Sequence, residues 1–341
     1  MPRTLLITLD FPPLTGGIAH YYQQRVAQLD PTEVVILMNK ISETKKLDAK
    51  IKIYYKKFFC KVIWPHWLPL IWQIIKVVRK EKITELWVGQ ILPVGTATII
   101  ANIFLHLPYR VTCHGNDLLR AKKHPRKFKL ARKILAGATE VEANTEFTKN
   151  ILIRDFSISE DKIKIIRPEN TLTKGMANRD KMDAFITERN LVGKQILLSV
   201  GRLVESKGFD QVLEALFELK QDFSDLVYLI VGEGPYKKQL TQKAEQLGLA
   251  DKVFFLGQVD HSELPHYYGL ANAFIMTPQI NSFGDTESFG IVYLEAAEFG
   301  IPIIAGRVGG VEEIIKSEDD GYLVDSENIQ DIKNTILKVL K

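Results

Sequence analysis

The stretch GDTESFGIVYLEA at residues 284–296 places two carboxylates, Glu287 and Glu295, eight positions apart. Gly290 lies between them, and the apolar run after it predicts a helix. A glycine before a helix lets the backbone approach a ligand closely, and the first N–H groups of the helix suit phosphate. A helix rises about 1.5 Å per residue, so the carboxylates would lie about 12 Å apart, enough to reach a sugar and a ribose on either side of a diphosphate. The alternative is a helix with a solvated glutamate at each end.

Outside this stretch, apolar runs of strand length alternate with helical patterns, which indicates parallel sheets with crossover helices. Residues 169–176 are rich in turn residues and divide the alternation into two series. The sequence therefore predicts an α/β fold with two Rossmann-like domains, residues 1–168 and 169–341, that bind ligands beyond the carboxyl ends of their strands. The expected strands are residues 4–9, 33–38, 51–55, 84–89, 109–113, 139–143 and 162–166, then 195–200, 226–231, 252–256, 273–276, 302–305 and 321–324.

Length and composition narrow the class of protein. The chain has 341 residues, which suggests two domains, and its 46% hydrophobic and 25% charged content fits a folded soluble protein. Cys60 and Cys113 match neither a disulfide framework nor a metal site, which indicates a reducing compartment. We expect no signal peptide. We also expect no transmembrane segment, because glycines and prolines interrupt the longest uncharged stretch, residues 86–109.

Two loops of the second series carry chemistry. Arg202 and Lys207 follow the strand that ends at Gly201, and together they can neutralise a diphosphate, Arg through its planar fork and Lys as a point charge. The alternative is a pair of solvated cations. The turn VGEGP at residues 231–235 either lines a nucleotide pocket or serves only as a strand-to-helix turn, since Pro235 suits the first helical position.

Two loops of the first series follow strands in the same way. In DFPPLTGGI, residues 10–18, Gly16 and Gly17 permit a tight turn and close approach of a ligand, but the pattern is not the dinucleotide fingerprint. In CHGND, residues 113–117, His114 could donate a hydrogen bond to a substrate hydroxyl or hold developing charge. The alternatives are a turn that needs glycine only for its geometry, and a His114 that is incidental to a helix cap at Asn116 or Asp117.

Taken together, these loops resemble those of retaining glycosyltransferases of the GT-B fold, in the large family 4, or glycosyltransferase group 1. The loop at residues 201–208, the turn GEG at 232–234 and the glutamate pair occur in the order typical of that family. DFPP at residues 10–13 and ESFGIVYLEA at 287–296 are particularly similar to the phosphatidylinositol mannosyltransferase branch. The resemblance covers nearly the whole chain. It implies two domains facing across a cleft, the first taking the acceptor and the second the nucleotide-sugar donor.

The resemblance also implies a role for each position. Arg202 and Lys207 would bind the donor diphosphate, Glu287 the sugar hydroxyls and Glu295 the ribose, while His114 would lie near the donor sugar and assist the reaction. Other contacts with phosphate, sugar or base are implied for glycine turns, backbone amides and a base-binding loop, at Gly16, Gly17, Gly232, Gly257, Val259, Phe289, Gly290 and Ile291.

The implied reaction moves a hexosyl group of the mannose or glucose type from a GDP- or UDP-linked donor, such as GDP-mannose, with retention of configuration. The donor C1–O bond breaks toward an oxocarbenium-like state, and the acceptor attacks from the same face. No metal or other cofactor is expected, and DTE at residues 285–287 is not the Asp-x-Asp of metal-bound nucleotide sugars. Family members usually end in a helix that crosses back onto the first domain. This helix is expected to be missing here, because the chain ends after the helical run at 329–340.

Two segments bear on the acceptor. Residues 58–82 combine tryptophans with cations, and residues 120–133 carry eight cations and no acid. Aromatic residues beside a basic face suit a membrane interface, and each cation contributes about 1 kcal/mol of attraction to anionic lipid. The alternative is a helix packed by its tryptophans and a solvated basic face. The residues are Lys57, Lys61, Trp64, Trp67, Trp72, Lys76, Arg79, Lys80 and Lys82, and Arg120, Lys122, Lys123, Arg126, Lys127, Lys129, Arg132 and Lys133.

The sequence thus favours a nucleotide sugar, a lipid-linked or glycan acceptor and an anionic membrane surface as partners, and no nucleic acid. The expected location is cytoplasmic, peripheral at the inner face of the membrane, in cell-envelope polysaccharide or glycolipid biosynthesis. Two other hypotheses stay open: a nucleotide-sugar binding module without turnover, and a GT-B sugar-nucleotide epimerase, which the pair Glu287 and Glu295 disfavours.

Overall fold

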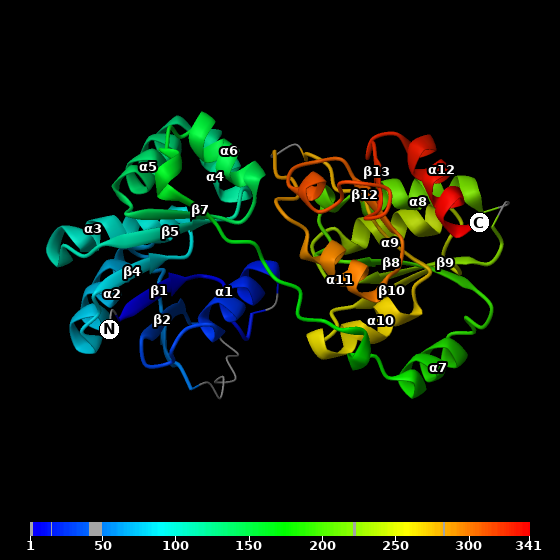
Figure 1. Ribbon diagram of the computed structural model, residues 1–341, viewed down its shortest axis with the longest axis horizontal. Helices are drawn as coiled ribbons and strands as arrows, with labels where there is room; N and C mark the ends of the chain where they lie inside the picture. Colours follow the sequence, from blue (N-terminus) through cyan, green and yellow to red (C-terminus); the bar gives the residue numbers. More distant parts are fainter. Residues whose placement is uncertain (1–2, 15, 41–49, 221–222, 282–283) are drawn as a thin grey trace. The chain divides into compact units, whose positions relative to one another are not determined.

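The computed structural model describes residues 3–14, 16–40, 50–220, 223–281 and 284–341. The chain divides into two compact units, unit 1 (Met1–Glu169) and unit 2 (Asn170–Lys341), which the colours of Figure 1 follow from blue to green and from green to red. This division lies one residue beyond the expected one. Each unit is a parallel sheet with crossover helices, as the alternating pattern predicts.

Unit 1 is built on a parallel sheet that, in the described residues, has the strand order β3-β2-β1-β4-β5-β6-β7. The direction of strand succession reverses between β1 and β4, the kind of position at which open α/β sheets bind ligands. The strands are β1 (Thr4–Thr8), β2 (Val34–Asn39), β3 (Lys52–Lys56), β4 (Glu85–Val88), β5 (Tyr109–Cys113), β6 (Glu140–Ala143) and β7 (Ile163–Ile165). The helices are α1 (Gly17–Ala27), α2 (Leu68–Glu81), α3 (Thr96–Leu105), α4 (Asn116–Lys122), α5 (Pro125–Gly137) and α6 (Glu146–Arg154).

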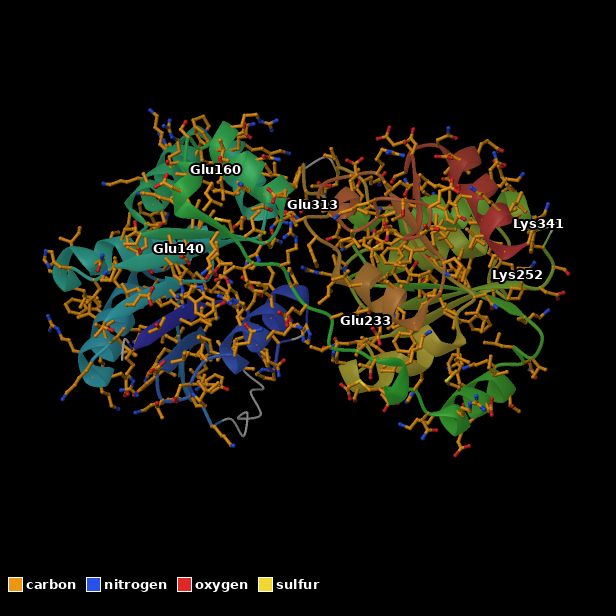
Figure 2. The ribbon with its side chains drawn as sticks, viewed as in Figure 1. Glu140, Glu160, Glu233, Lys252, Glu313 and Lys341 are labelled. Carbon is orange, nitrogen blue, oxygen red and sulfur yellow. The ribbon has the colours of Figure 1, made fainter. Side chains whose placement is uncertain are left out.

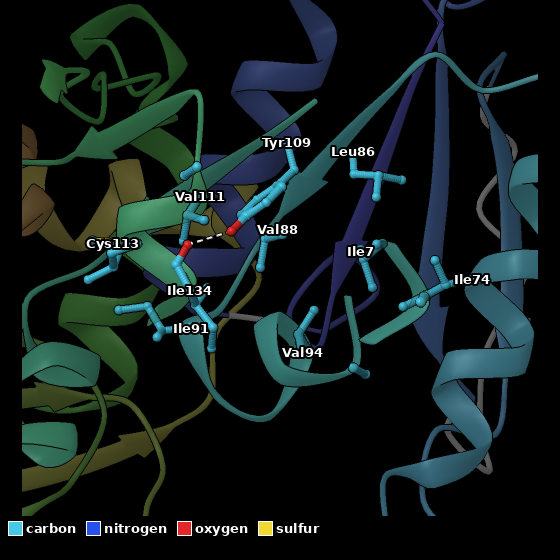
Figure 3. Packing of buried hydrophobic residues seen from close by; sticks show 14 of the residues in the cluster. Ile7, Ile74, Leu86, Val88, Ile91, Val94, Tyr109, Val111, Cys113 and Ile134 are labelled. Carbon is cyan, nitrogen blue, oxygen red and sulfur yellow. Dashed lines mark hydrogen bonds between the residues drawn. The ribbon is translucent and has the colours of Figure 1, made fainter. Parts of the chain in front are cut away.

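The sheet of unit 1 buries a separate core on each face, because successive side chains of a strand point to opposite sides. Leu5 and Ile7 of β1 belong to the core beneath α2, α3, α5 and α6, whereas Leu6 belongs to the core beneath α1. Figure 3 shows part of the first core, in which the Tyr109 hydroxyl donates a hydrogen bond to the Ile134 carbonyl at 2.7 Å. Helix α1 therefore lies on the face opposite to α2 and α5.

A buried ionic network ties α1 to the sheet. Arg25 of α1 pairs with the carboxylate of Glu142 on β6 at 3.1 Å, and the Thr112 hydroxyl on β5 donates to that carboxylate at 2.6 Å. Glu142 is fully buried, in contrast to exposed glutamates such as Glu160 and Glu233 (Figure 2). Removing one partner of a buried ion pair is strongly destabilising, so this network holds α1 in place on the sheet.

Unit 2 has a parallel sheet of order β10-β9-β8-β11-β12-β13 within the described residues, with a core on each face. Its strands are β8 (Gln195–Val200), β9 (Leu226–Val231), β10 (Val253–Gly257), β11 (Ala273–Met276), β12 (Ile303–Gly306) and β13 (Tyr322–Val324). Its helices are α7 (Arg179–Glu188), α8 (Phe209–Leu219), α9 (Lys237–Gln246), α10 (Leu264–Leu270), α11 (Ile291–Phe299) and α12 (Ile329–Leu340). Among the residues that the structure describes, no helix has both the length and the hydrophobicity of a membrane span.

Residues 117–135 form two helices rather than one. Helix α4 ends at Lys122 and α5 begins at Pro125. His124, the residue before the proline, has an extended backbone with φ −124° and ψ 112°. The ring of a proline disfavours helical geometry at the preceding residue, so the break lies where the proline requires it.

Gly208 is a position at which a side chain has no room. Its φ is 72°, and a Cβ there would lie 1.8 Å from the carbonyl oxygen of Thr277. Gly193 has a similar φ of 73° but nothing within 4 Å of its Cβ position. We expect Gly193→Ala to cost about 1 kcal/mol, for left-handed backbone alone, and Gly208→Ala about 2–4 kcal/mol, because the steric overlap is added. Urea unfolding of both variants measures the difference, and equal losses would contradict the steric account.

Candidate functional site

Lys207 and Glu287, which are 80 positions apart in the chain, form an ion pair in unit 2 between the Lys207 Nζ and the Glu287 carboxylate. Lys207 lies in the loop between β8 and α8, and Glu287 lies in the loop after β11. Both loops follow carboxyl ends of neighbouring strands, which is why the two side chains meet. Arg202 lies in the same loop as Lys207 and is exposed. The structure thus places two cations and a carboxylate at one edge of this sheet.

The backbone of Glu287 is held by the loop after β12. The N–H of Gly310 donates to the Glu287 carbonyl at 3.0 Å. A Cβ on Gly309, whose φ is 61°, would lie 1.9 Å from that same carbonyl oxygen. The two loops therefore touch backbone to backbone, which leaves the Glu287 side chain directed by a fixed main chain.

Helix α11 begins directly after Gly290, whose φ of 87° is left-handed. A Cβ on Gly290 would lie 2.5 Å from the ring of Tyr293, so glycine is required for both conformation and space. The first N–H groups of a helix attract anions, and here those of Ile291 and Val292 precede the Tyr293 N–H, which donates to the Gly290 carbonyl at 3.0 Å. Phe289 is buried and anchors the turn in front of this helix. This arrangement fits phosphate binding at the start of α11.

Glu295 is not the solvated glutamate of the alternative interpretation. Only 4% of it is exposed, and the Tyr268 hydroxyl of α10 donates to its Oε2 at 2.6 Å. Burial raises the pKa of the Glu295 carboxyl, and the hydrogen bond from Tyr268 acts in the opposite direction. One oxygen of this buried carboxylate accepts the hydrogen bond from Tyr268, and the second oxygen can accept a hydrogen bond from a ligand.

The remaining expected positions of unit 2 lie on loops that follow strands. Gly232 follows β9, and a Cβ on it would lie 1.9 Å from the carbonyl oxygen of Gly201 after β8. The N–H of Gly232 donates to the carbonyl of Gly257, the last residue of β10, at 2.8 Å. Val259, two residues further on, is half-buried against the core. These contacts join the loops after β8, β9 and β10.

In unit 1, Gly16 and Gly17 open α1 and are both exposed. Gly16 has a φ of 133°, and a Cβ at either position would meet nothing within 4 Å. Glycine is therefore needed at position 16 for the backbone conformation rather than for space within the unit. Open, exposed backbone at the carboxyl end of β1 is suited to contact a ligand.

His114 follows β5 and is buried. Its backbone N–H donates to Asp117 Oδ1 at 3.1 Å, so Asp117 also organises the turn into α4, as the capping alternative proposes. Burial lowers the pKa of His114 to about 4 and raises that of Asp117 to about 6. The imidazole is therefore neutral near pH 7.

The sequence-based prediction missed Gln90. Its Oε1 accepts from the Leu9 N–H at 2.9 Å, and its Nε2 donates to Thr8 Oγ1 at 3.0 Å and to Asp10 Oδ2 at 3.1 Å. Gln90 thus ties the end of β4 to the loop that leads from β1 toward Gly16. The available signal was a polar side chain directly after an apolar strand, within a long stretch without charges.

Across the described residues, no group of three or more His, Cys, Asp or Glu side chains is arranged to hold a metal ion. The absence of a metal from the reaction stays a prediction.

Two family models match the chain. The model described as Glycosyltransferase Family 4 matches residues 15–168, and the model described as Glycosyl transferases group 1 matches residues 182–341. Among relatives, a GDP-mannose-dependent alpha-(1-6)-phosphatidylinositol monomannoside mannosyltransferase of Mycolicibacterium smegmatis is 28% identical, over 97% of this chain and 87% of its own length. A GDP-mannose-dependent monoacylated alpha-(1-6)-phosphatidylinositol monomannoside mannosyltransferase of Corynebacterium glutamicum is 26% identical, over 99% and 88%.

Solved structures of similar fold include Alr3699/HepE of Anabaena in complex with UDP and glucose, with a TM-score of 0.83, 18% identity, and coverage of 100% of this chain and 90% of that one. Sucrose-phosphate synthase of Thermosynechococcus elongatus has a TM-score of 0.82 with 19% identity and the same coverage. At these identities the likeness shows the fold, and the predicted GT-B class is confirmed. The chain belongs to the family 4, group 1 glycosyltransferases and is a glycosyltransferase of the GT-B fold.

Proposed function

We propose that this chain is a retaining, metal-independent hexosyltransferase that moves a sugar from a nucleoside diphosphate donor to a hydroxyl of a lipid-linked acceptor. The observation that carries the proposal is the Lys207–Glu287 ion pair beside the N-terminus of α11. A cation, a carboxylate and free helix N–H groups are the groups that a diphosphate-linked sugar requires at one place.

In this proposal the donor spans the loops of unit 2. Lys207 and Arg202 take the diphosphate, with the N–H groups of Gly290 and Ile291, and donor binding exchanges the Lys207–Glu287 contact for contacts with phosphate and sugar. Glu287 accepts hydrogen bonds from hydroxyls of the donor sugar. Glu295, eight residues later, accepts from the ribose through the oxygen that Tyr268 leaves available.

The base is assigned to the loop at Gly257 and Val259, beside Gly232, where backbone groups are held by strand ends. In unit 1, the exposed backbone of Gly16 and Gly17 is assigned to the donor phosphate and the acceptor, and His114 to the donor sugar. These assignments follow the family resemblance position by position.

The chemistry depends on stabilising the departing diphosphate. Breakage of the C1–O bond puts charge on the phosphate oxygens, and groups already aimed at that charge lower the barrier. Lys207, Arg202 and the start of α11 supply this stabilisation without a metal. The acceptor hydroxyl attacks C1 from the face that the phosphate leaves, the new C1–O bond forms there, and the hydroxyl proton passes to the phosphate. Configuration at C1 is thereby retained.

The donor base and sugar are assigned from the relatives. Mannosyltransferases whose names state GDP-mannose dependence match this chain at 26–28% identity over nearly its whole length. We therefore propose GDP-mannose as the first donor to test, with UDP-glucose second.

The acceptor is assigned from the same names and from two surfaces of unit 1. The aromatic surface consists of exposed apolar residues before and within the first turns of α2: Val62, Ile63, Trp64, Leu68 and Trp72. The basic surface consists of the exposed cations of α4, of the residue after it and of α5: Arg120, Lys122, Lys123, Arg126, Lys127, Lys129, Arg132 and Lys133.

The alternative of a helix packed by its tryptophans holds only for Trp67, which packs on the core. Trp64 is 85% exposed and Trp72 is 72% exposed. Helices α2 and α5 cover the same face of the sheet, so both surfaces belong to that side of unit 1. We propose that this face rests on anionic lipid at the inner face of a membrane, which presents the acceptor.

The donor assignment is tested by release of nucleoside diphosphate from GDP-mannose and UDP-glucose, with phosphatidylinositol monomannoside vesicles as acceptor. We expect Lys207→Ala to lower the release rate at least about a hundredfold, because a charge-stabilising group is lost. Lys338→Ala, which breaks the exposed 2.9 Å pair with Glu318 in the same unit, should leave the rate unchanged.

Near-normal release by Lys207→Ala, with the melting temperature preserved, would refute the site. A donor that raises the melting temperature without release under any acceptor would favour the binding module. Conversion of the donor to its epimer without release would favour the epimerase.

The prediction that transfer needs no metal is tested with a chelator. Because the described side chains supply cations for the diphosphate and no metal-ligand cluster, we expect the transfer rate to be unchanged in excess EDTA. A rate that falls with EDTA and recovers when Mg²⁺ or Mn²⁺ is added back would contradict metal-independent transfer.

The membrane assignment is tested by co-sedimentation with phosphatidylglycerol vesicles. We expect the triple variant Lys123→Glu/Arg126→Glu/Lys127→Glu to partition at least about a hundredfold more weakly, at roughly 1 kcal/mol per cation. Lys122 is left intact because it pairs with Asp155 at 2.8 Å. The matched control reverses three exposed cations of unit 2, Arg179→Glu/Lys238→Glu/Lys316→Glu, and should bind as the wild type does.

The aromatic surface is separated from general apolar exposure by comparing Trp72→Ala with Phe217→Ala. Phe217 is 41% exposed on α8 of unit 2, outside the proposed face. Only the tryptophan variant should lose vesicle binding. Binding unchanged in both the basic triple variant and Trp72→Ala would rule out this face.

A further inference from the structure

Tyr22 connects two strand ends of unit 1 from within α1. It is fully buried, and its hydroxyl lies 3.0 Å from His114 Nε2 after β5 and within hydrogen-bond distance of the Gly89 carbonyl after β4. The sequence drew attention to His114 but not to Tyr22. The three residues form a hydrogen-bonded relay, His114–Tyr22–Gly89, that the roles assigned above do not use.

The direction of the relay follows from counting protons. A tyrosine hydroxyl has one proton, and a carbonyl oxygen can only accept. The Tyr22 hydroxyl therefore donates to Gly89, and it accepts from His114, which must carry its proton on Nε2. Nδ1 of a neutral imidazole protonated at Nε2 is an acceptor.

The Gly89 end of the relay is held by a contact between two strands. The N–H of Gly89 donates to the Ile7 carbonyl of β1 at 2.9 Å, and a Cβ on Gly89 would lie 2.9 Å from that same oxygen. The carbonyl that orients Tyr22 is thus fixed by the contact between β4 and β1.

The surroundings favour a neutral ring. The rings of Tyr21 and Tyr22 both stand edge-on to the imidazole, with centroids at 5.5 Å. Burial lowers the pKa of His114 to about 4, while the Gly89 carbonyl acts in the opposite direction. Asp117 faces the backbone N–H of His114, at 3.1 Å from its Oδ1.

We propose that Tyr22 is the positioning residue that holds His114 as a neutral imidazole with Nδ1 turned into a hydrogen-bond acceptor for a hydroxyl of the donor sugar. This rests on the proposed function. It replaces the expectation that His114 donates a hydrogen bond to the substrate, because the ring's proton is engaged by Tyr22. No bond is made or broken at His114 in this role.

The relay is tested first without any substrate. In the ¹⁵N-histidine-labelled protein, which has seven histidines, the His114 signals are those lost in His114→Gln. We expect a neutral ring protonated at Nε2 from pH 8 down to about pH 5, protonating only near pH 4. A proton on Nδ1, or titration near the ordinary value of about 6.5, would overturn the relay.

The role in transfer is tested by Tyr22→Phe against Tyr21→Phe. Both tyrosine rings lie edge-on to His114, but the Tyr21 hydroxyl interacts with Arg25, whereas the Tyr22 hydroxyl lies 3.0 Å from His114 Nε2. We expect kcat for GDP-mannose to fall about tenfold in Tyr22→Phe, as for one lost buried hydrogen bond, and less than twofold in Tyr21→Phe. A melting temperature measured for each variant shows that the fold is kept.

The same comparison with the 2-, 3-, 4- and 6-deoxy donors separates positioning from a structural effect. If Nδ1 accepts from one sugar hydroxyl, the defect of Tyr22→Phe disappears with the donor that lacks that hydroxyl. An equal defect with every donor, or equal kcat in the two variants, overturns the proposal. If the wild-type chain transfers no sugar, the role in transfer falls with the proposed function, whereas the tautomer spectrum still decides the relay.

Discussion

The proposed donor site of this enzyme depends on backbone-to-backbone contact between loops at the carboxyl edge of a parallel sheet. A Cβ on Gly208 or Gly309 would lie 1.8 or 1.9 Å from a carbonyl oxygen of the neighbouring loop, that of Thr277 or Glu287. Because no side chain separates these loops, Lys207 and Glu287 meet as an ion pair. A charged group directed by a fixed main chain needs little reorganisation when charge develops on a leaving phosphate, which is the condition for electrostatic catalysis.

In unit 1, buried polar side chains hold helix α1 against the sheet. Arg25 and Glu142 anchor α1 to the sheet, and Tyr22, one turn earlier, reaches the ends of β4 and β5. The same helix begins at the exposed Gly16 and Gly17. Helix α1 therefore begins at the glycine turn and also supplies the tyrosine that contacts His114. One helix thus connects the proposed phosphate contact of this unit with its proposed sugar contact.

Prediction from the sequence succeeded where the signal was local and failed where it was not. The strands and the loops that follow them were predicted from apolar runs and turn residues. Gln90 was missed because its partners, Thr8 and Asp10, are about eighty residues away in the chain. The exposure of Trp64 and Trp72, and the partial burial of Trp67, could not be predicted from three tryptophans within nine residues.

The sequence by itself determined two parallel α/β units, the family, and the loops in which charged side chains follow strand ends, because each of these is encoded in short segments. Only the tertiary structure decided that Lys207 meets Glu287, that Glu295 is buried against Tyr268, and that the Tyr22 hydroxyl lies 3.0 Å from His114 Nε2. Those properties arise from contacts between residues 27 to 92 positions apart in the chain. Burial and hydrogen-bond direction are set by such partners, and a single side chain in a sequence does not carry them.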